Sequence, residues 1–374
     1  MLSRERLQNR FIDMIRVYSP SKGEKEMADW IEHWLTERNI PFKSDHAGEA
    51  YGGNGRNIVA FVKGSTDERP LGFVAHMDQI EPCRDVHPVI DGKMIYTDHT
   101  TTLGGDDKAG ISAILEAVED VIESGFPHRD IYLVFTCSEE ISMMGTKHMD
   151  MSMLPCKELV VVDATGGADV LAYKAPAMEA IEITVTGKKA HAGIAPEKGI
   201  NAIVVASKAI SRMHIGRIDH ETTSNIGHIE GGTATNIVTD EVSFTAEIRS
   251  HSMEKLAAEL QHMEQCCQEA TEEMGAGYVL KHELAYPTLS LEEDCALIED
   301  TVRAMAAEGI TANKMIIGGG SDANVLAGHG YKSVILGCGM INVHTVEEAL
   351  DTDEMWKTTK VLRRLMSEDQ EMRA

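Results

Sequence analysis

Long apolar runs are missing from this chain. No stretch of about 18 apolar residues, the length needed to span a membrane, occurs in its 374 residues. The charged segment at residues 1–6 has no apolar segment behind it of the kind found in secretory leaders. Basic charge is also scarce, because 35 Lys and Arg stand against 60 Asp and Glu, giving a formal net charge of −25. Nucleic acid and anionic membranes repel such a chain, so we expect neither as a partner and predict a cytoplasmic protein.

Paired cysteines and nucleotide-binding motifs are missing as well. The seven cysteines are odd in number and lack the CxxC spacing of a structural zinc site, which indicates reduced thiols. Cys137 lies beside two carboxylates, but no dedicated base identifies it as a nucleophile, and a buried packing role is favoured. The glycines of residues 318–320 are followed by no Lys-Ser/Thr pair, so they do not form a phosphate-binding loop.

The sequence does contain several short apolar runs that end in a histidine or a carboxylate. A short apolar run predicts a buried strand, and ligands of open α/β sheets bind where such strands end. Histidine, Asp and Glu together suit zinc, cobalt or manganese, so five such places in one chain predict a shared metal site. They are His76 after residues 71–75, Asp106 after the glycines at 104–105, Glu139 and Glu140 after residues 133–137, Asp163 after residues 159–162, and His344 after residues 334–336 and a loop.

The adjacent carboxylates Glu139 and Glu140 can do different work. Neighbouring side chains of an extended or turning backbone point in different directions, so one can bind a cation while the other handles a proton. Asp78 follows His76 by two residues, on the same side of an extended chain. It is therefore expected to orient the imidazole rather than to bind a metal itself.

Asp106 and Asp107 open a helix after a glycine loop. We expect Asp106 to bridge two cations and Asp107 to cap the helix N-terminus. Capping alone would explain one carboxylate well and two poorly. Several carboxylates buried at strand ends without a cation would also be costly.

The length of the chain exceeds that of one usual core and predicts two domains. The first is an α/β catalytic domain with a mixed, mostly parallel sheet flanked by helices, made of residues 1–173 and 289–374. In it, strands at 57–62 and 71–75 are expected to form a hairpin. Residues 174–288 are predicted to form an inserted lid or dimerisation domain, because their strand and helix patterns follow the β-α-β-β-α-β order of the ferredoxin-like α+β unit.

An ordered set of motifs resembles the M20 family of dizinc metallopeptidases, most closely its peptidase T (tripeptide aminopeptidase) branch. The related M42 aminopeptidases insert their extra domain between the first His and the bridging Asp. That interval is only thirty residues in this chain, too short for such a domain. The motifs, which run over almost the whole chain, are His76-Met77-Asp78, Gly105 to Gly110, Ser138-Glu139-Glu140, Asp163, Ala190 to Gly193, Thr235-Asn236-Ile237, Arg249, Gly319 to Asp322 and His344.

The resemblance implies a role for each matching residue. Asp106 bridges two divalent ions, expected to be zinc, with cobalt or manganese as alternatives, and His76, Asp163, Glu140 and His344 complete the two ligand sets. Glu139 is the general base and Asp78 orients His76. His191 approaches the scissile carbonyl, in many relatives from the partner subunit of a dimer, which makes a homodimer through the inserted domain possible. Asn236 and Arg249 hold the substrate, and Gly320 and Ser321 belong to a loop that a peptide-like substrate approaches.

Simpler interpretations exist for the residues of the inserted domain. His191 can be an exposed residue at a strand end, Arg249 can form a surface salt bridge, and Asn236 can support a turn.

The favoured function is hydrolysis of a peptide bond in short peptides by an exopeptidase. The alternatives are a dipeptidase or carboxypeptidase, an amidohydrolase of the same scaffold that acts on N-acyl or N-carbamoyl amino acids, and a metal-stabilised binding protein without turnover. A free base such as Glu139 has no use in the last of these.

Overall fold

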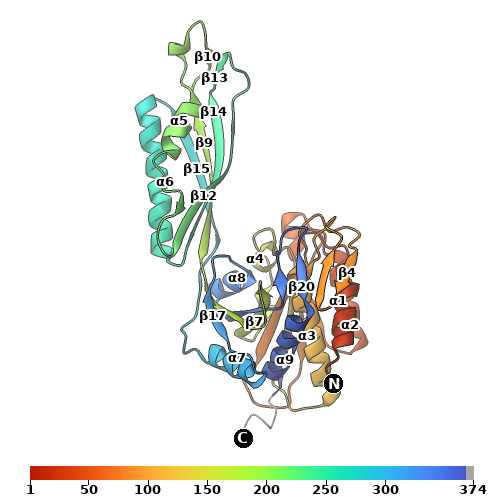
Figure 1. Cartoon of the computed structure of the whole chain (residues 1–374). Helices are drawn as coiled ribbons and strands as arrows, with labels where there is room; N and C mark the ends of the chain where they lie inside the picture. Colours follow the sequence, from red (N-terminus) through yellow and green to blue (C-terminus); the bar gives the residue numbers. More distant parts are fainter. Residues whose placement is uncertain (368–374) are drawn as a thin grey trace. The chain divides into compact units, whose positions relative to one another are not determined.

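The structure, a computed structural model, describes residues 1–367 (Figure 1). The chain divides into two compact units. Unit 1 contains Met1–Lys174, Leu289–Ile317 and the described residues from Ser321 onward, and unit 2 contains Ala175–Thr288 together with Gly318–Gly320.

Unit 1 is built on a nine-stranded mixed sheet, so the predicted α/β class is confirmed. Strands β6, β3, β7 and β18 lie side by side and run parallel, and antiparallel strands flank them on both sides. β17 (Asn313–Ile316) pairs with β8 outside the main order. That order is β1 (Phe42–Ser44), β2 (Ile58–Val62), β6 (Ile131–Thr136), β3 (Leu71–His76), β7 (Glu158–Ala164), β18 (Lys332–Gly337), β8 (Val170–Ala175) and β16 (Leu289–Ser290).

The hairpin expected from strands 57–62 and 71–75 is wrong. β6 lies between β2 and β3, pairing antiparallel with the first and parallel with the second. β3, β6 and β7 are apolar along almost their whole length and nearly fully buried, which places them in the middle of the sheet. A short polar turn between two strands favours a hairpin locally, but this burial pattern decides the pairing.

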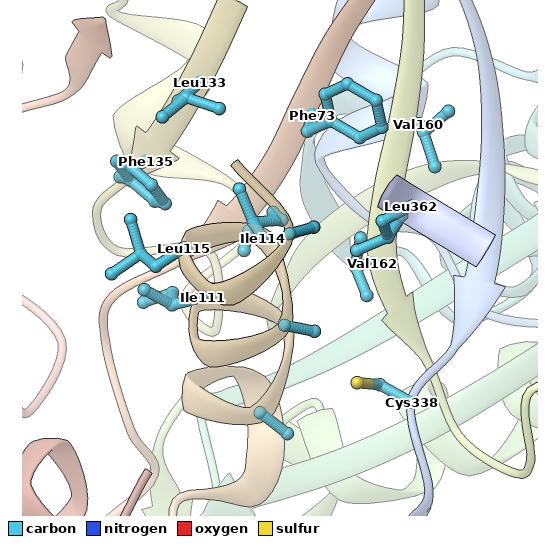
Figure 2. Packing of buried hydrophobic residues seen from close by; sticks show 14 of the residues in the cluster. Phe73, Ile111, Ile114, Leu115, Leu133, Phe135, Val160, Val162, Cys338 and Leu362 are labelled. Atoms are coloured by element: carbon cyan, nitrogen blue, oxygen red, sulfur yellow. The ribbon is translucent and has the colours of Figure 1, made fainter. Parts of the chain in front are cut away.

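Helices cover the sheet of unit 1, and α3 lies at the centre of its core. α3 packs against β3 and β7 and against α1 and α9. Figure 2 shows its residues Ile111, Ile114 and Leu115 among side chains of β3, β6, β7 and α9. The helices of this unit are α1 (Arg4–Ile15), α2 (Lys25–Glu37), α3 (Gly105–Ser124), α4 (Met144–Lys147), α7 (Ala296–Ala307), α8 (Asp322–Gly328) and α9 (Thr352–Met366), with 3-10 turns η1 (Ala47–Tyr51) and η2 (Met151–Met153).

A small antiparallel sheet also belongs to unit 1. Its strands, in spatial order, are β19 (Met340–Ile341), β20 (Ala349–Asp351), β5 (Met94–Thr97) and β4 (Pro88–Asp91). β19 and β20 pair with each other, so the loop at residues 342–348 is closed at its base. This loop contains His344.

Unit 2 is an antiparallel sheet packed against two helices. The strand order β12-β14-β9-β15 and the β-α-β-β-α-β sequence of elements are those of the ferredoxin-like unit. Alternate residues of β14, such as Phe244 and Ile248, face the helices and are buried. The elements are β9 (Ala177–Thr186), β10 (Ala190–His191), η3 (Pro196–Lys198), α5 (Ala202–Ile210), β11 (Gly216–Arg217), β12 (Thr222–Gly231), β13 (Ile237–Val238), β14 (Glu241–Ser250), α6 (Met253–Met274) and β15 (Gly277–Tyr286).

Among residues 1–367, no helix has both the length and the apolar character needed to cross a membrane.

Candidate metal centre

Three neighbouring parallel strands bring their candidate ligands to one edge of the sheet. His76 is the last residue of β3, Glu139 and Glu140 follow the end of β6, and Asp163 lies near the end of β7. β3 pairs in parallel with both other strands, so these ends meet. Two more candidate ligands come from elsewhere in unit 1, Asp106 from the start of α3 and His344 from the loop between β19 and β20.

The five candidate ligands form two groups that share Asp106. Asp106 Oδ1 lies 2.9 Å from His76 Nε2, and Asp163 Oδ1 lies 3.6 Å from the same nitrogen. Asp106 Oδ2 lies 3.1 Å from His344 Nε2, and Glu140 Oε2 lies 3.0 Å from it. Two ligand atoms at tetrahedral angles on a zinc ion, each about 2.0–2.1 Å from it, are about 3.3 Å apart. The four histidine-to-carboxylate distances lie near that value, and the ligand atoms of His76, Asp106 and Glu140 all lie within 4.8 Å of one another. We call these five residues the cage.

One oxygen of the cage is buried and unsatisfied. Glu140 Oε1 has no hydrogen-bond partner among the described residues, although it is shielded from solvent. Burial of an unpaired carboxylate oxygen is costly, and a cation would remove the cost. The residues present therefore fit a divalent cation at each end of the shared Asp106.

The charges of the cage also fit cations. Burial raises the pKa of Asp163 to about 7. Hydrogen bonds to Asp106 and then Glu140 raise the pKa of His344 to about 10. Burial opposes protonation of His76, but its hydrogen bonds with Asp106, Asp163 and Asp78 outweigh that effect and raise its pKa well above its usual value. The carboxylates outnumber the histidines, and their negative charge favours protons on the histidines and would equally favour a bound cation.

Asp78 contacts both His76 and the turn that carries Glu139 and Glu140. His76 Nδ1 lies 3.1 Å from the carbonyl oxygen of Asp78, its hydrogen-bond partner, and 3.4 Å from Asp78 Oδ1. Asp78 Oδ1 accepts a hydrogen bond from the backbone N–H of Glu139 at 2.9 Å. Its Oδ2 accepts hydrogen bonds from the N–H of Glu140 at 3.2 Å and from Ser21 Oγ at 2.7 Å. It therefore contacts the imidazole as expected for an orienting residue, and it also fixes the turn that carries the two carboxylates.

Asp107 is a competing candidate for a ligand, since His76, Asp107 and Asp163 also lie close enough together to hold an ion. Both of its oxygens already accept hydrogen bonds, Oδ1 from the N–H of Gly110 at 3.1 Å and Oδ2 from the N–H of His76 at 3.3 Å. The first is the bond of a helix N-cap, since the backbone leaves helical geometry at Asp106 and Asp107. We therefore favour Asp106 as the ligand and Asp107 as the cap.

Glu348 is a residue of the site that the sequence did not indicate. Its carboxylate accepts hydrogen bonds from three backbone N–H groups, those of Leu103 at 2.7 Å, Gly104 at 2.9 Å and Asp106 at 2.9 Å. It is 2 % exposed and ties the loop of His344 to the loop of Asp106. The contact joins residues more than 240 positions apart, and no local pattern of the sequence points to it.

Glu139 is buried beside the cage without being part of either ligand group. Burial, and then the charge of Asp163, raises its pKa well above the usual value for a carboxyl group. A carboxylate whose proton affinity is raised in this way is suited to accept and return a proton near neutral pH. Cys137, two residues before it, has its thiol pKa raised by burial, which agrees with the expected packing role.

Gly320 and Ser321 have structural contacts. A Cβ at Gly320 would lie 2.3 Å from the ring of Tyr286. Ser321 is the N-cap of α8, where its Oγ accepts a hydrogen bond from the N–H of Ala323 and Asn324 completes a capping box. These contacts explain both residue types, and a contact with substrate stays a prediction.

His191 and Asn236 lie together at one end of unit 2. β10 and β13 pair there, with His191 opposite Ile237, and the N–H of Ala192 donates to the carbonyl of Asn236 at 3.0 Å (Figure 1). Both residues are exposed. Arg249 lies near the other end of β14, where its Nε and Nη2 donate to the two oxygens of Glu247 at 2.9 and 3.1 Å. The salt bridge that was the simpler interpretation of Arg249 is thus present.

Comparison with known proteins gives two family matches and several close relatives. Residues 179–275 match the peptidase dimerisation domain of M20 peptidases, and residues 89–203 match the M42 glutamyl aminopeptidase model. The chain is 36% identical to the uncharacterized protein YqjE of Bacillus subtilis over 98% of this chain and 99% of that protein.

Two solved structures are similar over nearly the whole chain. The aminopeptidase PepT of Bacillus cereus is 35% identical, with a TM-score of 0.92, and a tripeptidase of Staphylococcus aureus is 32% identical, with a TM-score of 0.95. In both cases the match covers 98% of each chain.

Proposed function

The chain belongs to the M20 family of metallopeptidases, in its peptidase T-like branch, and from this premise we propose that it is a dinuclear aminopeptidase that removes the first residue of tripeptides and similar short peptides. The observation that carries the proposal is the pair of ligand groups joined through Asp106, with the unsatisfied Glu140 Oε1. The relatives named for aminopeptidase and tripeptidase activity support the substrate class.

The cage residues would hold two divalent cations, which we propose to be zinc. His76 and Asp163 belong to one position, Glu140 and His344 to the other, and Asp106 to both. When bound, such a pair supplies a Lewis acid and lowers the pKa of bound water from about 15.7 towards about 7. Asp78, Asp107 and Glu348 hold these ligands in place through the contacts described above.

Glu139 is the proton carrier of the proposed reaction. Asp78 fixes its backbone beside the cage through the hydrogen bond from the N–H of Glu139. Glu139 accepts the proton of the attacking water and then gives it to the amine that leaves when the peptide bond breaks. The raised pKa of the buried carboxyl makes Glu139 a stronger base, which favours the first half of this transfer.

Within one copy of unit 2, His191 and Arg249 lie too far apart to contact one short peptide. His191 and Asn236 lie beside the Glu241 end of β14, and eight residues at about 3.3 Å each place Arg249 about 26 Å along the strand. If all three hold the same substrate, His191 and Asn236 must come from one subunit and Arg249 from another. This supports a homodimer.

The edge of β12 offers a surface for such a dimer. β14 pairs with one side of β12 along residues 222–231. On the other side β11 pairs only with Thr223 and Ser224, and the described residues place no strand there beside residues 225–231. Those residues are mostly exposed, Ile229 by 54%. An exposed strand edge with an apolar side chain is a site for pairing with another copy, and it lies in the part of the chain that matches the dimerisation domain.

The test is hydrolysis of matched peptides by the full chain loaded with zinc, cobalt or manganese. We expect an unblocked tripeptide to lose its first residue, an amino-blocked peptide to resist, and an N-acyl amino acid to be a poor substrate. Glu139→Gln should reduce kcat at least about a thousandfold while the bound metal stays the same. The exposed Glu26→Gln on α2 is the matched control and should behave like the wild type.

Two results would contradict the proposal. Preference for the carboxyl-terminal residue, or for N-acyl substrates, would replace the aminopeptidase by one of the other hydrolases. Unchanged turnover in Glu139→Gln would remove the assigned role of this carboxylate.

A further inference from the structure

Unit 2 contains a second group of metal-binding side chains, separate from the cage. His214 lies in the loop between α5 and β11, and Glu259 and His262 lie one turn apart on α6, on the same side of that helix. One ligand atom from each of these three residues lies within 4.8 Å of the others. We call them the His214 cluster.

The contacts within the His214 cluster are close and incomplete. His214 Nδ1 lies 3.2 Å from Glu259 Oε2, and the two imidazole rings stack with their centroids 4.0 Å apart and their planes 18° apart. The Glu259 side chain is 8% exposed. Its Oε1 is buried and has no hydrogen-bond partner in the described part of the chain.

A simple His–Glu ion pair does not account for this arrangement. Such a pair satisfies one oxygen of Glu259 and leaves the other buried and unpaired, which is unfavourable. A cation bound by the carboxylate and the two rings would give this buried oxygen a partner.

The residues around the His214 cluster are arranged to hold its members. Nε2 of His262 lies 3.3 Å from the carbonyl oxygen of Arg212 and 3.6 Å from Cys266 Sγ. A ring whose one nitrogen is engaged in this way can offer the other to a cation. The carbonyl of His214 accepts a hydrogen bond from Ser224 Oγ, which fixes its backbone. The His214 side chain itself is 57% exposed, so an ion can reach it from solvent.

We propose that His214, Glu259 and His262 form a further binding site for a cation of the zinc class, with water in the open fourth position. Two histidines and one carboxylate are a ligand set that zinc accepts, and the Glu-x-x-His spacing on a helix presents two of the three together. The ion would join the α5–β11 loop to α6 and so stabilise unit 2. The site is independent of the proposed peptidase function.

The test counts zinc in the full chain. The wild type and the His214→Ala/His262→Ala variant are stripped with a chelator, equilibrated with micromolar free zinc and analysed for metal per chain. The variant should hold about one zinc ion less than the wild type. It should hydrolyse peptides at the same rate as the wild type. The matched control, His220→Ala, removes another exposed histidine of unit 2 and should keep the wild-type zinc content.

A second variant covers the case in which the double substitution prevents folding. Glu259→Gln preserves the shape of the side chain and removes its charge. It should also bind about one zinc ion less than the wild type. Zinc should raise the Tm of unit 2 in the wild type and should not raise it in this variant. Equal zinc content in the wild type and in both variants would overturn the proposal. It would leave His214 and Glu259 as an ordinary ion pair.

Discussion

Unit 1 and unit 2 hold their candidate catalytic side chains in opposite ways. In unit 1, His76, Asp163 and Glu139 lie at the ends of buried neighbouring strands, and Asp78 and Glu348 fix the backbone around them. In unit 2, His191 and Asn236 are exposed on a two-stranded ribbon, and Arg249 lies at the other end of the sheet.

This difference separates two kinds of functional residue. The cage is complete within one copy of unit 1, because each of its five side chains lies within 3.6 Å of another of them. His191 and Asn236 of unit 2 lie at the opposite end of the sheet from Arg249, so within one copy the three do not surround one site. We infer that the first set determines whether the reaction occurs at all, and that the second depends on assembly.

The sharpest test of the unit 1 side is Asp106→Asn. Asp106 is the one residue that both ligand groups share, so its loss should weaken both cation positions at once. We expect turnover to fall at least about a thousandfold, or about 4 kcal/mol in the barrier, with less metal bound per chain. Steady-state kinetics and metal analysis measure this, with the exposed Asp67→Asn as control. A variant that kept full metal content and activity would show that Asp106 does not bridge.

Assembly of the unit 2 side can be tested by mixing two inactive variants. His191→Ala alone should cost about a hundredfold in kcat, as expected for a lost donor to the oxyanion. Co-expression of His191→Ala and Arg249→Ala chains produces mixed dimers in which one site regains both residues only if they come from different subunits. With random pairing, about a quarter of wild-type activity should return. No recovery, with mixed dimers present, would mean that both residues act within one chain or in separate roles.

Support of the cage by Glu348 should have a smaller effect. Glu348→Gln keeps the size of the side chain but weakens three hydrogen bonds from the loop that carries Asp106. Metal affinity should fall about 10- to 100-fold while the fold and its Tm stay close to those of the wild type. Titration of the metal-free chain with zinc measures this. Glu347→Gln, at an exposed neighbouring position, is the control. Equal affinity in both variants would make Glu348 a purely local loop contact.

Glu348 also marks the limit of what the sequence could predict. The candidate ligands could be found because each follows a local pattern, an apolar run that ends in a histidine or carboxylate, and neighbouring parallel strands end at the same edge. Glu348 has no such pattern, since its partners lie about 240 positions away. The pairing of β6 between β2 and β3 was missed for the same reason: it is decided by burial of whole strands and not by the turn between them.

In unit 2 the sequence predicted the elements better than the contacts. The alternation of Val242, Phe244, Ala246 and Ile248 in β14 is visible in the chain and is the buried face in the structure. The pairing of β10 with β13, which brings His191 next to Asn236, joins segments more than 40 residues apart. The Oε1 of Glu259 could not be recognised as unsatisfied before its surroundings were known.

The mildest prediction is the pH dependence of metal binding to the cage. The pKa of His344 is raised to about 10 by Asp106 and Glu140, so the metal-free chain carries a proton there at neutral pH. A cation needs the neutral imidazole and must displace this proton, so affinity should rise at least about tenfold per pH unit up to about pH 10. Below about pH 7 the dependence should become steeper, because Asp163, with its pKa raised to about 7 by burial, then also carries a proton. Competition with a chelator of known affinity at several pH values measures the slope. A metal affinity independent of pH between 7 and 9 would show that His344 is not a ligand. As a control, substitution of exposed side chains of unit 2 should leave the slope of metal affinity against pH unchanged.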